Sequence, residues 1–382
     1  MAARVTLSVG ILAMGLLAGA TAAAQKPDSR APEAALLRPN DAMILMDYQV
    51  LRVVGDKPID LMGFHVHNKV ADWLYLGAGL YAPLFKGEYG GFTAFDIAAH
   101  AQQRLTPRLF ATAGLSAGGG AGGRSVEQAK VLSGTGSFFK AYVGLGYDLG
   151  NFSVGVNLAR MKFIRSAIDG TQANVFLEIP YTYLTGPFSS HGQALSPADA
   201  GEASKSASEK MLTVVFDNFR QQNPEGTFKG SFSIADLQYA HYFARDTYWY
   251  AGLGVGYRGL PLYNQVLGGV GQRVQLSPRF AVYGQLGIGS GGYAPERLNT
   301  DAGLLVYPKV SAEYALTKDL GLSLSAGYLV APKGSSKNVS FGLGLTHHIR
   351  VGDGPSLASD VGGPPTYQAF RVSLFQQTSS GG

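Results

Sequence analysis

An alternation of apolar and small polar residues recurs from Ala42 onward and constrains this chain more than any other feature. In the segment 152–158, Phe, Val and Leu alternate with Ser, Gly and Asn, and the segments 320–326 and 341–346 repeat the pattern. Side chains on a β-strand point to opposite faces in turn. Each segment therefore has one apolar face and one small polar face, which predicts an all-β chain.

The polar faces of these segments carry few charges, since Asp, Glu, Lys and Arg make up only 15% of the chain. A soluble β-sandwich also alternates, but its outer face meets water and is polar. No apolar run of about 18 residues follows Ala42, so the mature chain is not expected to cross a membrane by a helix. In lipid, only a closed barrel lets strands pair all their backbone groups. We therefore predict a transmembrane antiparallel β-barrel.

The segments, read in order, give about sixteen strands, with fourteen as the alternative. The joins between them alternate in length, with short joins such as 105–108 and longer ones such as 119–136. Outer-membrane barrels have short periplasmic turns and longer extracellular loops. With a periplasmic N-terminus, every short join falls on the periplasmic side.

One stretch occurs twice in similar form. Residues 105–115 and 276–286 each contain a Thr/Ser-Pro-Arg turn and a new strand, followed by a glycine-rich run. This favours a barrel region 42–350 made of two half-repeats, 42–188 and 211–350, with a periplasmic linker at 189–210. The alternative is chance, because glycine-rich strands resemble one another.

The two ends of the chain differ in sequence pattern from the strand segments. Arg4, the apolar segment 5–20 and the alanines at 22–24 predict a cleaved signal peptide at 1–24, with an uncleaved anchor as the alternative. Residues 25–41 are expected to form a periplasmic lead-in. The tail 351–382 alternates again at 367–375. This segment is expected to be a final strand, an assembly signal or a periplasmic appendage.

By these patterns the chain resembles Gram-negative outer-membrane β-barrel proteins of porin-like type, from about Ala42 to Arg350. The resemblance rests on no diagnostic motif. It implies a location in the cell outer membrane, with outer-membrane lipid, lipopolysaccharide and the envelope assembly machinery as partners. The net charge of +5 comes without a basic helix, so no nucleic-acid binding is expected.

The chemistry-bearing residues do not form a recognisable active site. The chain has no cysteine, and the pairs His65/His67 and His347/His348 have no visible third ligand, so we expect neither a metal nor a cofactor. Asp96 and His100 share a face but lie about 13 Å apart along a strand. That spacing excludes a single catalytic hydrogen bond, so no catalytic residue is predicted.

The lumen is a better candidate for function. Inward-facing residues that would set selectivity are Asp96, His100, Arg104, Gln265 and Arg273. The long join 119–136 carries three further charged residues and would fold inward as a constriction: Arg124, Glu127 and Lys130.

On the outer face, Arg160 and Lys162 continue the apolar series 152–158 toward the predicted extracellular rim. Cations at that position are suited to bind lipopolysaccharide phosphates. The alternative is that they snorkel at the strand end.

A sixteen-stranded barrel leaves a water-filled lumen unless it is plugged. The leading expectation is therefore a weakly selective passive channel for small solutes. Its sparse lumen charges keep open an alternative, a structural or assembly barrel of the envelope with a loop-filled lumen. A lipid-modifying enzyme ranks last.

Overall fold

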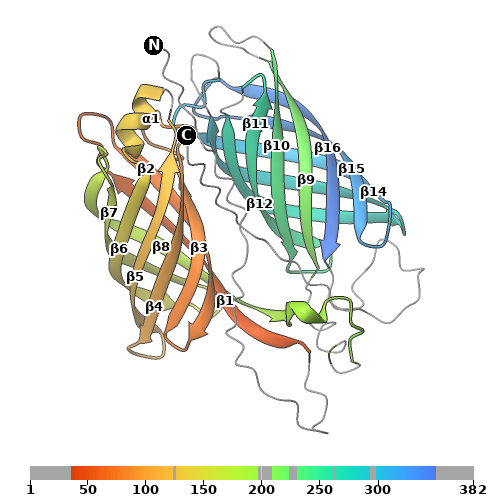
Figure 1. The fold of residues 1–382 in the computed structure, drawn as a ribbon, viewed down its shortest axis with the longest axis horizontal. Coiled ribbons are helices and arrows are strands. Elements are labelled where there is room, and N and C mark those ends of the chain that lie inside the picture. The colour runs from red at the N-terminus through yellow and green to blue at the C-terminus, as the bar shows by residue number, and fades with distance from the viewer. Residues whose placement is uncertain are drawn as a thin grey trace, which may run out of the picture.

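The computed structural model describes residues 36–123, 126–196, 199, 209–222, 230–260, 263–292 and 298–349. They form two closed antiparallel β-barrels that lie side by side (Figure 1). The expected signal peptide, most of the lead-in, much of the linker 189–210 and the tail 351–382 lie outside the described residues.

Barrel 1 is formed by the first eight strands and closes where β1 pairs with β8, with Arg38 opposite Thr185 and Tyr48 opposite Val175. The strands are β1 (Arg38–Leu51), β2 (Ile59–Ala71), β3 (Leu74–Ala82), β4 (Thr93–Arg104), β5 (Leu109–Ala121), β6 (Ser137–Asp148), β7 (Ser153–Phe163) and β8 (Asp169–Thr185). A helix, α1 (Val126–Ser133), lies in the join between β5 and β6, and a short 3-10 helix, η1 (Phe188–Ser190), follows β8.

Barrel 2 is formed by the last eight strands and closes where β9 pairs with β16, with Lys210 opposite Ile349. The strands are β9 (Lys210–Gln221), β10 (Ser231–Tyr242), β11 (Thr247–Arg258), β12 (Asn264–Ser277), β13 (Phe280–Gly292), β14 (Leu304–Ala315), β15 (Leu320–Val330) and β16 (Lys337–Ile349).

The all-β class, the antiparallel pairing and the total of sixteen strands are confirmed. The expected single lumen is corrected, because the strands close as two rings of eight. The physical reason is that β8 reaches the free edge of β1 and pairs with it along most of its length. Once that edge is paired, β9 has no edge of barrel 1 to join and begins a second ring.

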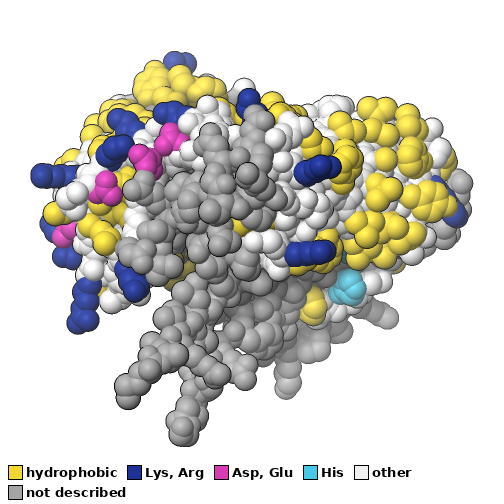
Figure 2. Space-filling model, turned by 90° about the horizontal axis from the view of Figure 1, so that it is seen from above, with side chains coloured by type: hydrophobic (Ala, Val, Ile, Leu, Met, Phe, Trp, Pro, Cys, Tyr) yellow, Lys and Arg dark blue, Asp and Glu magenta, His cyan; other side chains and the backbone are white. Residues whose placement is uncertain are grey.

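The two faces of each strand differ as the alternation predicts. Large apolar side chains on the outer surface stay exposed, such as Leu115 and Leu324 at 66% each. Figure 2 shows such apolar side chains spread over the flank of barrel 2 on the right, while Lys and Arg side chains project around barrel 1 on the left. Within the described residues, no helix is long and apolar enough to cross a membrane.

Each barrel is filled by an apolar cluster at the end that carries the longer joins. The barrel 1 plug consists of Leu51, Val53, Ile59, Leu61, Tyr81, Tyr89, Phe92, Ala94, Leu132, Phe138, Met161, Phe163 and Ile168. The barrel 2 plug consists of Phe219, Phe232, Ile234, Leu260, Tyr263, Leu267, Leu298, Leu305, Tyr307, Leu329 and Ala331. Helix α1 contributes Leu132, which is fully buried.

At the plug end, the join between β3 and β4 contacts barrel 2. The Gly90 amide donates to the Asp301 carbonyl at 3.1 Å. The Asn264 side chain donates to the Gly91 carbonyl at 3.0 Å and accepts from the Thr93 hydroxyl at 3.1 Å. The joins of one barrel therefore share polar contacts with the strand ends of the other.

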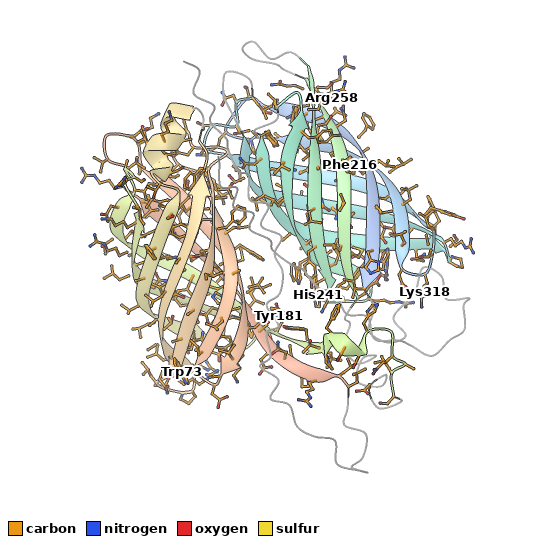
Figure 3. All side chains as sticks on the ribbon, in the orientation of Figure 1. Trp73, Tyr181, Phe216, His241, Arg258 and Lys318 are labelled. Atoms are coloured by element: carbon orange, nitrogen blue, oxygen red, sulfur yellow. The ribbon has the colours of Figure 1, made fainter. Side chains whose placement is uncertain are left out.

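A second contact lies at the opposite end. The first residues of β1 pair only with the last residues of β8, and this two-stranded ribbon projects beyond barrel 1 (Figure 1). The ring of Tyr181 lies 6.4 Å from that of His241, and the Lys210 ammonium lies 5.1 Å from the Tyr183 ring. Figure 3 labels Tyr181 and His241. The two barrels therefore touch at both ends.

Candidate functional site

Glycines on the third strand of each barrel allow the interior networks to form. An added Cβ at Gly79 in β3 would lie 2.1 Å from the His65 ring, and one at Gly254 in β11 would lie 2.9 Å from the Gln265 side chain. Since these positions carry no side chain, residues of the second and fourth strands meet above the third. Alternating glycine is thus the local reason that polar groups converge.

The centre of barrel 1 holds two buried polar pairs. The Lys140 ammonium on β6 lies 2.5 Å from the Asp47 carboxylate on β1 and donates to the Tyr81 hydroxyl at 3.0 Å. His65 on β2 lies 2.9 Å from Asp96 on β4. All of these side chains are buried. A buried ion pair is costly to break, because removing one partner leaves the other charge uncompensated.

Below this centre, barrel 1 contains a group of imidazoles. The His67 ring lies 5.8 Å from the rings of both His65 and His100. His100 contacts the Tyr142 hydroxyl at 2.5 Å and lies 3.3 Å from the Glu178 carboxylate. Neither ring nitrogen of the fully buried His67 has a hydrogen-bond partner within the described chain. This part of barrel 1 is incompletely paired.

The centre of barrel 2 repeats the arrangement on the corresponding strands. The Lys309 ammonium on β14, the sixth strand, lies 2.8 Å from the Asp217 carboxylate on β9, the first strand. Gln265 on the fourth strand donates to Asp236 on the second at 3.1 Å. The Asp–Lys pairs therefore join the same two strand positions in both barrels.

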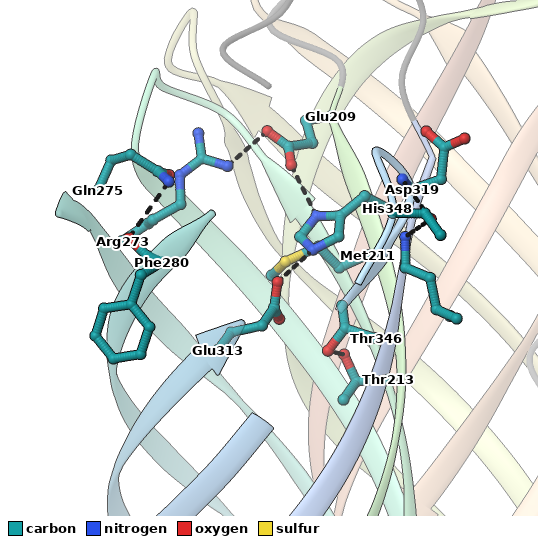
Figure 4. A network of polar contacts seen from close by, with 12 residues as sticks. Glu209, Met211, Thr213, Arg273, Gln275, Phe280, Glu313, Asp319, Thr346 and His348 are labelled. Carbon is teal, nitrogen blue, oxygen red and sulfur yellow. Dashed lines mark hydrogen bonds and ion pairs between the residues drawn. The ribbon is translucent and has the colours of Figure 1, made fainter. Parts of the chain in front are cut away.

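Below its centre, barrel 2 holds the Arg273 network, formed by Arg273, Glu209, His348 and Glu313 (Figure 4). The Arg273 guanidinium lies 2.8 Å from Glu209 and 3.2 Å from Asp246. His348 contacts Glu209 at 3.0 Å through Nδ1 and Glu313 at 2.7 Å through Nε2. Two carboxylate acceptors fit an imidazole that donates from both nitrogens. Unlike His67, this histidine is fully paired.

The five predicted lumen residues are divided between the barrels. Asp96 and His100 point into barrel 1 and are buried, whereas the Arg104 side chain is 63% exposed at a strand end and pairs with Asp148 at 2.7 Å. Gln265 and Arg273 are buried inside barrel 2. The five residues are therefore not brought together in one pore. Asp96 contacts His65, whereas His100 contacts Tyr142 and Glu178.

The long join 119–136 differs from the expected constriction in its described part. Arg124 lies outside the described residues, and Glu127 lies in α1 with its side chain undescribed. Lys130 in the same helix is exposed, while Leu132 enters the barrel 1 plug. The helix therefore places an apolar side chain, not this lysine, at the barrel end.

Several interior charges were not singled out from the sequence, namely Asp47, Lys140, Glu178, Glu209, Asp217, Lys309 and Glu313. Each pairs with a side chain on a strand that is not its hydrogen-bonded neighbour. The sequence did contain one signal for these interior charges, because Asp47 and Asp217 align when the two half-repeats are compared. An inward charge on a strand calls for a partner in the same interior.

The side chains of these networks bind one another and so hold strands together. Their described contacts do not form a recognisable catalytic arrangement. Among the described residues, no group of three or more His, Cys, Asp or Glu side chains is placed to hold a metal ion.

In the linker, the Ser196 hydroxyl and the Leu36 and Leu37 amides donate to Asp199 and hold the pKa of that carboxyl below its ordinary value.

No protein-family model matches this chain, and no curated protein matches it. Similar solved structures include a de novo designed transmembrane β-barrel, with 14% identity over 37% of this chain and 95% of that chain and a TM-score of 0.27. They also include Pseudomonas putida OprB at high pH, with 9% identity, coverage of 82% and 94%, and a TM-score of 0.22. A third is the deltaS2 mutant of the monoaromatic hydrocarbon channel TodX, with 11% identity, coverage of 82% and 89%, and a TM-score of 0.20.

At these identities and scores, the comparisons carry no argument about the activity of this chain. The chain's own features do carry one about its class: closed antiparallel rings, exposed apolar outer faces and polar interiors. These are the features of β-barrels that span the outer membrane. The chain is a β-barrel protein built of two closed antiparallel barrels.

Proposed function

We propose that the protein is a sealed pair of outer-membrane barrels with a structural or assembly role in the cell envelope. Eight strands enclose an interior that side chains are just able to fill. Apolar plugs occupy one end of both barrels, and polar networks occupy the middle. From the residues that the structure describes, we infer that neither barrel offers small solutes an open path.

The observation that carries the proposal is the buried Asp–Lys pair in each barrel. Lys140 is 3% exposed and Lys309 is 5% exposed. In a water-filled pore the ammonium groups of inward lysines would be hydrated. Here Lys140 lies between a carboxylate and the rings of Tyr81 and Tyr142, and Lys309 lies between a carboxylate and the Tyr307 ring.

A second candidate is a narrow, weakly selective channel through barrel 1. The specific observation in its favour is the incompletely paired interior around His67. Buried polar atoms of this kind are usually satisfied by ordered water. A hydrated interior is the starting point for such a path, although the wide lumen expected of one sixteen-stranded ring is not available to it.

Single-channel recording in planar bilayers separates the two candidates. We expect the purified full-length protein to show no steady conductance. Steady conductance in the wild type would overturn the sealed pair. If that conductance then changed with Lys140→Ala but not with the matched Lys309→Ala, the path would lie in barrel 1.

We also propose that the two barrels derive from duplication of one half, with the repeats at 42–188 and 211–350. Three equivalences support this. The Pro107 and Pro278 turns both precede a fifth strand, the Asp–Lys pairs join first and sixth strands, and glycines on both third strands make room for the networks. Expression of each half alone tests it: each should insert as a heat-modifiable barrel, and failure of both halves to fold would contradict it.

A further inference from the structure

The outer surface of barrel 1 carries an open apolar groove of about 530 Å³ across β3 to β7. Its lining includes Ala99, Ala101, Ala113 and Ala141, with Leu115 and Leu158 among the larger residues. Alternation on these strands places the alanines on the lipid-facing side. Their small side chains leave a hollow where neighbouring positions carry exposed leucine and valine.

The register of the strands leads from this hollow directly to a cation. Ala99 on β4 lies opposite Leu115 on β5, Leu115 opposite Ala141 on β6, and Ala141 opposite Arg160 on β7. Residues directly opposite on neighbouring strands have Cβ atoms about 5 Å apart. Arg160 is therefore the last residue of the cross-strand row that lines the groove.

The next row toward the plug end finishes on a second cation. Phe139 on β6 lies opposite Lys162 on β7, and Lys162 lies opposite Asp169 on β8. The side chains of Arg160 and Lys162 are 63% and 53% exposed. Both point away from the barrel, as their alternation with the buried Ala159 and Met161 requires.

A single carboxylate serves both cations. Asp169 lies 3.1 Å from Arg160 and 2.9 Å from Lys162. Two cations around one carboxylate leave a local net positive charge. A guanidinium has five N–H donors and an ammonium has three, so both retain donors for an added anion. Charge-assisted contacts to phosphate are among the strongest hydrogen bonds available to these groups.

The dimensions of the groove match part of a lipid. Five strands at a spacing of about 4.8 Å make the groove roughly 19 Å long across the strands, which a strand tilt of about 45° turns into roughly 13 Å of membrane depth. One leaflet of the hydrocarbon core is about 15 Å deep, half of about 30 Å. An acyl chain in the hollow would place its phosphate-bearing end near the cations, since they lie on the plug side of the groove.

We propose that the groove and the Arg160–Lys162 pair form a lipopolysaccharide site, in which an acyl chain fills the alanine hollow and a phosphate binds the two cations. The proposal rests on the proposed outer-membrane role for its location. It selects lipopolysaccharide over phosphatidylglycerol because the cations lie at the end with the longer joins, which in outer-membrane barrels is extracellular. Barrel 2 supplies a matched outward cation at the same end, Arg220 on β9.

The test measures lipid retained on the purified full-length protein in detergent, with lipopolysaccharide or phosphatidylglycerol as the probe. The double variant Arg160→Gln/Lys162→Gln should bind lipopolysaccharide at least about 10-fold more weakly, because two charge-assisted contacts are lost. Ala113→Phe should also weaken binding by filling the hollow while the cations remain. Asp169→Asn should strengthen it by removing the competing carboxylate.

The control Arg220→Gln should bind lipopolysaccharide as the wild type does. Equal losses in Arg220→Gln and in the double variant would overturn the site, as would phosphatidylglycerol binding as tight as lipopolysaccharide binding. The substitutions lie on the outer surface, so each variant should keep its heat-modifiable migration and its lack of conductance. A folded, non-conducting protein that fails to bind lipopolysaccharide would reject this site and leave the sealed barrel pair intact.

Discussion

In barrel 2 the imidazole of His348 contacts carboxylates through both nitrogens, while in barrel 1 the equally buried imidazole of His67 has no hydrogen-bond partner in the described chain. Around these groups the frame is the same, with an Asp–Lys pair joining first and sixth strands. This Asp–Lys pair holds strands of the closed ring together, which both barrels need. The incompletely paired interior of barrel 1 serves no evident packing purpose, so we expect any solute-dependent behaviour to lie there.

The stability of the two barrels can be followed separately. The chain has two tryptophans, Trp73 at the turn between β2 and β3 and Trp249 in β11. The backgrounds Trp249→Phe and Trp73→Phe therefore leave one fluorescent reporter in barrel 1 or in barrel 2. Urea unfolding of the protein in lipid vesicles then gives a free energy of unfolding for each barrel.

The largest effect on stability is expected from breaking the Asp–Lys pair that both barrels share. Lys140→Met should lower the free energy of unfolding of barrel 1 by about 3–5 kcal/mol, since the buried Asp47 carboxylate loses its ammonium partner. Lys309→Met should do the same to barrel 2 through Asp217. The doubles Asp47→Leu/Lys140→Met and Asp217→Leu/Lys309→Met should recover most of the loss. A loss below about 1 kcal/mol in either single variant would show that its pair is hydrated.

The contrast between the two histidines comes next. His348→Leu should destabilise barrel 2 by about 2–3 kcal/mol, because it deprives Glu209 and Glu313 of a charge-assisted contact. His67→Leu should change barrel 1 by less than about 1 kcal/mol, because no hydrogen bond is lost and the volume is similar. Equal losses from the two variants, measured with the matching tryptophan reporters, would remove the distinction between the interiors.

The glycines of the third strands should show a smaller contrast. In Gly79→Ala the new methyl group meets the His65 ring at 2.1 Å and the Phe64 carbonyl at 2.6 Å, so we expect a loss of about 2–3 kcal/mol. In Gly254→Ala the neighbours are flexible side chains at 2.9 Å or more, so the loss should stay below about 1 kcal/mol. If Gly254→Ala proved the more damaging variant, barrel 2 would be the tighter of the two.

The smallest effect concerns the contact between the barrels. Asn264→Ala removes the hydrogen bonds to the Gly91 carbonyl and the Thr93 hydroxyl. We expect a loss of about 1 kcal/mol and a wider gap between the urea midpoints reported by Trp73 and Trp249. Unchanged midpoints would indicate that the barrels unfold independently even in the wild type.

The strand content was readable from the sequence because period-two alternation is a local property. The same property fixed the inward direction of Asp96, His100 and Gln265, which are all buried in an interior. Ring closure was not readable, since one ring of sixteen and two rings of eight share the same alternation and the same alternating joins. The long join between the eighth and ninth strands was the one local hint.

The partners of the interior charges were also beyond the sequence. Asp47 on β1 and Lys140 on β6 are separated by four strands along the chain and meet only because the ring closes at eight. In a ring of sixteen, Lys140 would face a different set of neighbours. The pairing of interior charges is therefore a consequence of closure, and its prediction fails when closure is wrong.

Closure of β1 on β8 also bears on how the chain reaches its folded state. In a single ring of sixteen, β1 would wait for β16, and the entropy of closing that long loop would oppose assembly. Here Arg38 meets Thr185 and Lys210 meets Ile349, so each ring closes within its own segment. Shorter closures favour faster folding. The N-terminal ring therefore needs no strand of the C-terminal half to complete its hydrogen bonding.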